Sequence, residues 1–259
     1  MDHEAKTEVA ARLAKQLSKS YGNAILAVLL DGSVARGDDT EYSDIELRVV
    51  TRRRLRIGSM SENGYAEAVY RDLAIQLQFL EEKEVHRLIR YPTIEWPLKV
   101  WPFLEPTFVA QSREAEQVAK RFLRTYRNVR PGSFRPALRW SLVWVWEMYG
   151  KVRSMVERGS PDIVWVAPAL AHNAALFVAL TNRRYLHFGD SRYISEIESF
   201  PRLPDGFVRL FNELRTCDSS SMGQAAKEMW ESCSSFAREE GCPSLASETW
   251  SGFIRTIGL

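Results

Sequence analysis

The stretch from residue 24 to residue 50 constrains the fold of this chain more than any other. Residues 24–30 are all apolar, which is the pattern of a strand buried on both faces. Gly32 and Ser33 break this strand, and the residues after them are expected to begin a helix. A strand–glycine–helix corner presents backbone N–H groups and a hydroxyl to an anion. We therefore expect an anion-binding corner at Gly32 and Ser33.

Two acidic residues follow the corner after a polar loop. Asp44 and Glu46 open a second predicted strand, residues 45–50, and period-two alternation puts both side chains on one face. Adjacent carboxylates repel unless a cation or a proton lies between them. Hard oxygen ligands of this kind suit a metal-bound nucleoside triphosphate. The alternative is that Gly32 only forms a turn, and that both acids are solvated residues of an edge strand.

Composition and charge limit the classes of protein to which this chain can belong. The chain has 259 residues, of which 45% are hydrophobic and 26% charged, so it suits one large or two small globular domains. Its net charge of +2 argues against nucleic-acid binding as the main role. We expect no membrane segment, because no apolar run approaches the roughly 20 residues of a span. The N-terminus shows no signal pattern and the three cysteines have no metal-ligand spacing, which favours the cytoplasm.

The predicted elements divide the chain at Pro131. Before it we expect an amphipathic helix at 4–20, the two strands above, and a third strand at 67–79 that carries Asp72 and Gln76 on one face. Beyond it only helical periodicity is found, in residues 135–157, 162–180, 191–200, 205–215 and 222–240. The expected fold class is α+β. A mixed sheet with flanking helices occupies residues 1–130, and an all-α bundle occupies residues 131–259.

One face of the predicted helix at 135–157 is informative. Its members are Trp140, Trp144, Glu147 and Lys151, spaced four, three and four residues apart. From the spacing alone, the simplest interpretation is two core tryptophans beside a Glu–Lys pair on the helix surface. Stacking of the tryptophans on adenine is the alternative.

These motifs resemble those of known enzymes. The residues Gly32-Ser33, Arg36 and Ser43-Asp44-Ile45-Glu46 resemble the nucleotidyltransferase superfamily that includes DNA polymerase β. Residues 147–153 read EMYGKVR, which looks like the Glu-x-x-Gly-Lys-x-Arg segment of the kanamycin nucleotidyltransferases, the aminoglycoside 4'-O-adenylyltransferases. The N-terminal motif has the same internal spacing as in that family. The resemblance extends over nearly the whole chain, and the segment at Glu147 is its discriminating part.

The resemblance implies a role for each matching residue. Asp44 and Glu46 would hold Mg²⁺ on the triphosphate of ATP, and Glu147 would be the general base. The residues implied at the nucleotide are Gly32, Ser33, Arg36, Ser43 and Lys151. The residues implied at the aminoglycoside are Glu67, Asp72, Gln76 and Glu147. Because Gln76 stands where the family has an acidic residue, the use of one or two metal ions stays open.

The resemblance also implies a reaction and an assembly. AMP would pass from MgATP to the 4'-hydroxyl of an aminoglycoside of the kanamycin, tobramycin or amikacin type, with release of pyrophosphate and resistance to the antibiotic. The enzyme would be a homodimer in which the base of one subunit completes the site of the other. Two alternatives stay open: a nucleotidyltransferase acting on a protein, a tRNA end or another small alcohol, and a non-catalytic, antitoxin-like binding module.

Overall fold

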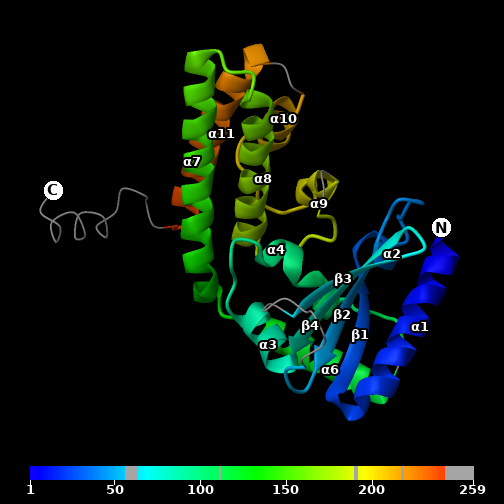
Figure 1. Ribbon diagram of the computed structural model, residues 1–259. Coiled ribbons are helices and arrows are strands. Elements are labelled where there is room, and N and C mark those ends of the chain that lie inside the picture. Colours follow the sequence, from blue (N-terminus) through cyan, green and yellow to red (C-terminus); the bar gives the residue numbers. More distant parts are fainter. Residues whose placement is uncertain (56–63, 111, 190–191, 217–218, 243–259) are drawn as a thin grey trace, which may run out of the picture. The chain divides into compact units, whose positions relative to one another are not determined.

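The computed structural model describes residues 1–55, 64–110, 112–189, 192–216 and 219–242 (Figure 1). The described chain divides into two compact units. The first unit is formed by residues 1–91 and 98–130, and the second by residues 92–97 and those after 130. A five-stranded sheet lies in the first unit and only helices are described after residue 130, so the α+β fold class is confirmed.

The sheet of the first unit is mixed, with strand order β3-β4-β2-β1-β5. β2 and β4 are parallel, whereas the other neighbouring pairs are antiparallel. The elements up to residue 130 are α1 (His3–Tyr21), a 3-10 helix (Gly22–Ala24), β1 (Ile25–Asp31), α2 (Gly32–Arg36), β2 (Ile45–Thr51), β3 (Tyr65–Tyr70), β4 (Leu73–Glu81), α3 (Glu82–Arg90), α4 (Trp96–Lys99), α5 (Trp101–Leu104), β5 (Thr107–Phe108) and α6 (Arg113–Arg127).

The two faces of this sheet are covered differently. On one face, α1 places Val9, Ala10 and Ala14 in a core cluster with the inward-facing residues of β1, β2 and β4. On the other face, α5 and α6 lie against Ala27 and Leu29 of β1. Every residue of β1 is therefore buried, which explains its uninterrupted apolar sequence. On the same face as Leu29, β2 and β4 present polar residues instead, and the candidate site is built there.

The prediction of a single strand at residues 67–79 is wrong, because two strands, β3 and β4, form an antiparallel hairpin there. Arg71 and Asp72 make its turn with φ values of 51° and 62°. Left-handed conformations at both central residues match the twist of a two-residue hairpin turn, and Asp tolerates them better than most residues. Neither glycine nor proline marks this turn, so the alternating pattern runs through it without a visible break. Asp72 consequently lies at the hairpin tip and not on the face of the sheet.

The second unit is helical. Its elements after residue 130 are a 3-10 helix (Pro131–Phe134), α7 (Arg135–Arg158), α8 (Ile163–Asn182), α9 (Tyr193–Glu198), α10 (Phe207–Glu213) and α11 (Ser219–Glu239). α7 and α11 pack on α8. By length and composition alone α8 could cross a membrane, so the expectation that no segment approaches such a span is wrong for it. In the structure, 61% of the most apolar 18-residue stretch of α8 is buried, as is typical of a core helix.

Residues 92–97 contribute to the second unit through a buried tryptophan. Trp96 is fully buried, and its ring meets Phe134 edge-on at a centroid distance of 5.0 Å. The next carbonyl, that of Pro97, accepts a hydrogen bond of 2.8 Å from the N–H of Leu186. This short segment therefore fills part of the helical core before the chain returns to the first unit.

Candidate active site

The expected strand–glycine–helix corner is present. β1 ends at Asp31, α2 begins at Gly32, and the N–H of Gly32 donates to Oδ1 of Asp31 at 2.7 Å. Gly32 has a φ of +67°, and a Cβ added to it would lie 1.9 Å from Oε2 of Glu46. Only glycine therefore lets the Glu46 carboxylate lie over this corner.

Four polar residues form a row across the sheet beside the corner. Asp31 is paired with Glu46, Glu46 with Gln76, and Gln76 with Glu67. Paired residues on adjacent strands point to the same face and lie about 5 Å apart. The hydroxyl of Tyr65 donates to Oε1 of Gln76 and ties the row together at β3. The structure thus brings together Glu46, Gln76 and Glu67, three of the predicted site residues.

The electrostatics of the row centre on Glu46. Burial raises the pKa of Glu46 to about 7, and the negative charge of Asp31 adds to this effect. Arg48 opposes the shift, whereas Asp44 raises the pKa further, so Asp44 lies close enough for the two predicted metal ligands to repel each other. A cation between these carboxylates would remove the repulsion.

The donor set fits magnesium held jointly with a nucleotide. No group of three or more His, Cys, Asp and Glu side chains arranged for a metal occurs in the described ranges. Mg²⁺ in nucleotide enzymes is bound through one or two carboxylates together with the phosphates. Asp44 and Glu46 would supply those two carboxylates, while Gln76 offers a neutral oxygen that already accepts from Tyr65.

Sequence reasoning missed the pair formed by Arg48 and Asp31. Nε and Nη2 of Arg48 both lie 2.5 Å from Oδ2 of Asp31, and Nη1 donates to Gln78. Nη2 is also 3.8 Å from Oε1 of Glu46. The alternation that places residues 44 and 46 on one face extends to residue 48, so the pattern contained this signal. Arg48 therefore holds a buried carboxylate on the strand next to the predicted metal ligand Glu46.

Four of the five residues implied at the nucleotide lie on the corner and on the loop after it, and Lys151 is described with α7 below. Ser33 belongs to the first turn of α2, and Arg36 ends this helix with Nε 3.3 Å from Oδ1 of Asp38. The hydroxyl of Ser43 accepts from the N–H of Thr40 at 3.0 Å, one residue before Asp44. These four residues belong to the first unit.

Asp72 is not brought to this group. It lies at the hairpin tip, four residues before Gln76 on β4. At a rise of about 3.3 Å per residue, this separation is roughly 13 Å along the strand.

The remaining predicted residues lie on α7 of the second unit. Nζ of Lys151 and Oε1 of Glu147 form an ion pair of 2.8 Å, with side chains 49% and 45% exposed. The interpretation of Trp140 and Trp144 as core residues is wrong, since they are 60% and 42% exposed. α7 buries a different side, which carries Val145 among other residues. Two indoles and the Glu–Lys pair thus share one exposed face of α7, the aromatic face.

Comparisons with known proteins add the following. Among solved structures, the chain is similar to a nucleotidyltransferase-like protein from Exiguobacterium sibiricum 255-15, with 14% sequence identity and a TM-score of 0.48. This similarity covers 90% of this chain and 75% of the other. No curated protein matches the chain. Residues 116–243, just under half of the chain, match the family model of the KNTase C-terminal domain. That match supports a nucleotidyltransferase of the kanamycin nucleotidyltransferase type.

Proposed function

We propose that this protein is an aminoglycoside O-adenylyltransferase. It transfers AMP from MgATP to the 4'-hydroxyl of aminoglycosides of the kanamycin, tobramycin or amikacin type, releases pyrophosphate and so confers resistance. The match of residues 116–243 to the KNTase C-terminal domain carries this proposal. The carboxylate of Glu46 over the Gly32 corner, whose pKa the negative charge of Asp44 helps to raise, supports it, because two such carboxylates fit a magnesium–nucleotide complex.

In this proposal the first unit binds the nucleotide. Asp44 and Glu46 hold magnesium, which when bound neutralises charge that develops on the α-phosphate. The phosphates are bound by Gly32, Ser33, Arg36 and Ser43, joined by Lys151. Arg48 does not touch the nucleotide but fixes Asp31 and the space available to Glu46.

Glu147 acts on the acceptor. Its carboxylate takes the proton of the attacking hydroxyl while the bond from oxygen to the α-phosphorus forms and the bond to pyrophosphate breaks. Glu67 and Gln76 bind the drug, and Asp72 contributes at its periphery. An acidic lining suits a polycation even on a protein of net charge +2. We propose a homodimer in which Glu147 of one subunit serves the nucleotide bound by the other.

The test is incubation of the protein with MgATP and kanamycin or tobramycin. Pyrophosphate release and a mass gain of one AMP on the drug are expected, and the absence of both would refute the proposal. Glu147→Gln should lose turnover while keeping its affinity for ATP. Glu157→Gln is the matched control, because Glu157 is also exposed on α7 and forms an ion pair with Arg153.

The dimer has its own test. A mixture of Asp44→Asn and Glu147→Gln proteins, each inactive alone, should regain activity through heterodimers that contain one intact site. No recovery after subunit exchange would contradict completion of the site by the partner.

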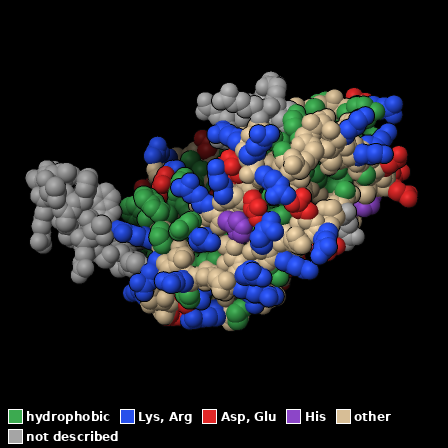
Figure 2. Space-filling model, turned by 90° about the horizontal axis from the view of Figure 1, so that it is seen from below, with side chains coloured by type: hydrophobic (Ala, Val, Ile, Leu, Met, Phe, Trp, Pro, Cys, Tyr) green, Lys and Arg blue, Asp and Glu red, His purple; other side chains and the backbone are tan. Residues whose placement is uncertain are grey.

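An RNA acceptor is the second candidate, and one surface favours it. Arg87 and Arg90 on α3 and Arg124 and Arg127 on α6 are all exposed. The two helices are packed together, with Nδ1 of His86 2.7 Å from the hydroxyl of Thr125. Lys and Arg side chains are frequent on the side of the protein seen in Figure 2. Guanidinium groups match phosphodiesters well. Transfer of labelled AMP to tRNA, and not to the drug, would decide for this candidate.

A further inference from the structure

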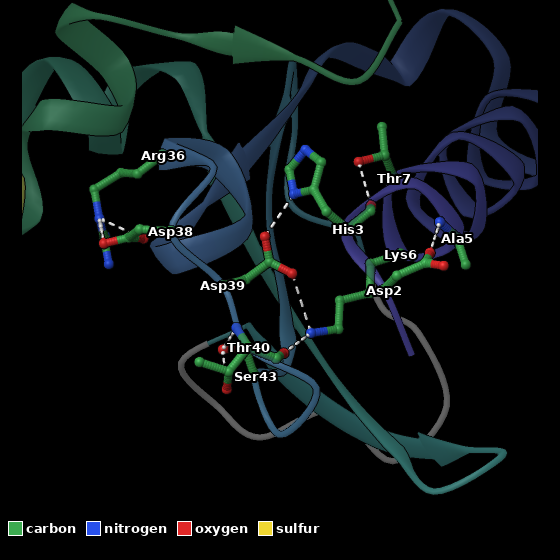
Figure 3. A network of polar contacts seen from close by, with 10 residues as sticks. All are labelled: Asp2, His3, Ala5, Lys6, Thr7, Arg36, Asp38, Asp39, Thr40 and Ser43. Carbon is green, nitrogen blue, oxygen red and sulfur yellow. Dashed lines mark hydrogen bonds and ion pairs between the residues drawn. The ribbon is translucent and has the colours of Figure 1, made fainter.

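A buried ion pair joins α1 to the loop between α2 and β2 (Figure 3). Lys6 of α1 is fully buried, and its Nζ lies 3.2 Å from Oδ2 of Asp39 and donates to the carbonyl of Thr40. The side chain of Asp39 is only 2% exposed, and its other oxygen lies 2.5 Å from Nδ1 of His3. These contacts lower the pKa of the Asp39 carboxyl against the opposing effect of burial. A buried charge is tolerated only when paired, so Lys6 and Asp39 depend on each other.

The loop held by Lys6 leads directly to the predicted magnesium ligands. Thr40 is its central residue, since its N–H donates to Oγ of Ser43 at 3.0 Å and its carbonyl accepts from the N–H of Ser43 at 3.1 Å. The same carbonyl accepts from Lys6. At the start of the loop, the N–H of Asp38 donates to the carbonyl of Ser33 at 3.2 Å. The loop is thus held at one end by the corner and in its middle by α1.

We infer that Lys6 is a positioning residue of the nucleotide site. Through the Thr40 carbonyl and the Asp39 carboxylate, it fixes the loop that sets Ser43 and Asp44 beside the Gly32 corner. An ammonium group has three donors, so it can hold two loop acceptors in a defined geometry, which an apolar side chain cannot do. The inference rests on the proposed function, because the loop is placed there to bind MgATP.

The experiment compares wild type with Lys6→Met by calorimetric titration of the full chain with MgATP, well below the melting temperature. Loss of charge-assisted hydrogen bonds to the loop should weaken MgATP binding by about tenfold or more. The KM for the acceptor should stay unchanged. Lys15→Met is the matched control, since Lys15 is an exposed lysine on the same helix, and it should bind MgATP like wild type.

A second variant separates positioning from stability. Lys6→Met alone leaves Asp39 buried without its ammonium partner, which destabilises the fold. Lys6→Met/Asp39→Leu removes both charges and should recover most of the melting temperature without restoring the hydrogen bond to Thr40. We expect this double variant to bind MgATP as weakly as Lys6→Met. Recovery of wild-type affinity in the double variant, or an unchanged affinity in Lys6→Met, would overturn the role of Lys6.

The outcomes distinguish this inference from the proposed function. MgATP binding by wild type without AMP transfer to any aminoglycoside would refute the proposed reaction, while the affinities of the variants would still decide the role of Lys6. A wild-type protein that does not bind MgATP would overturn both.

Discussion

Replacement of Gly32 by alanine should weaken nucleotide binding strongly at a modest cost in stability. Gly32 has a φ of +67°, and a left-handed alanine costs about 1–2 kcal/mol. In a protein of this size, that cost lowers the melting temperature by about 2–8 °C. The added Cβ would lie 1.9 Å from Oε2 and 3.0 Å from Cδ of Glu46, so the carboxylate must swing away. Because a predicted magnesium ligand is displaced, we expect MgATP affinity to fall about tenfold to a hundredfold.

Gly37→Ala is the control that isolates the steric clash between the added Cβ and Glu46. Gly37 also has a positive φ, +73°, but a Cβ added there meets no described atom within 4 Å. Thermal denaturation should therefore show similar losses for both variants, whereas calorimetric titration with MgATP should show the loss of affinity only in Gly32→Ala. Wild-type affinity in Gly32→Ala would refute the reasoning, and so would an equal loss in Gly37→Ala.

Three other side chains give measurable expectations. The pKa of Glu46 is about 7 in the native state against an ordinary value of 4.5, so the stability that this carboxyl contributes is complete below about pH 4.5 and is lost as pH rises through about 7. Urea unfolding without Mg²⁺ should therefore show wild type losing stability relative to Glu46→Gln between about pH 5 and about pH 8. Arg48→Met should lower the free energy of unfolding by about 3–5 kcal/mol, because Asp31 is left buried without its guanidinium partner. Adding Asp31→Asn to this variant should restore part of the lost free energy of unfolding. If the exposed indole of Trp144 stacks on adenine, Trp144→Ala should raise the KM for ATP up to about tenfold at an unchanged melting temperature, whereas Trp146→Ala, exposed on another side of α7, should not.

The local parts of the fold could be predicted because their signals are local. The apolar run of β1, the glycine after it and the alternation of β2 each follow from a few adjacent residues. The hairpin of β3 and β4 could not be predicted, because its turn at Arg71 and Asp72 contains neither glycine nor proline and the alternation of apolar residues runs through it. The membrane-like composition of α8 reflects the burial of most of this helix by its neighbours, and only the tertiary structure determines that.

The candidate site shows the same division. The pairing of Glu46 with Gln76 lies on the predicted strand face, and the Glu147–Lys151 ion pair follows from helical spacing, whereas the shared face of Asp44 and Glu46 stays a prediction because Asp44 precedes β2. The exposure of Trp140 and Trp144 could not be predicted from the sequence. Periodicity shows which residues share a side of a helix but not which side meets the core. The pairing of Arg48 with Asp31 depends on strand register, which brings together residues 17 positions apart.

The burial of Trp96 in the helical unit bears on how this chain can be divided. A gene cut at residue 130 would assign the indole to the wrong fragment, because residues 92–97 belong with the helices that follow. The helical fragment would then lack a fully buried aromatic ring that packs on Phe134, a loss of about 3–5 kcal/mol by comparison with large-to-small substitutions in cores. An exchange of either unit with that of another protein must therefore transfer two separate stretches of coding sequence.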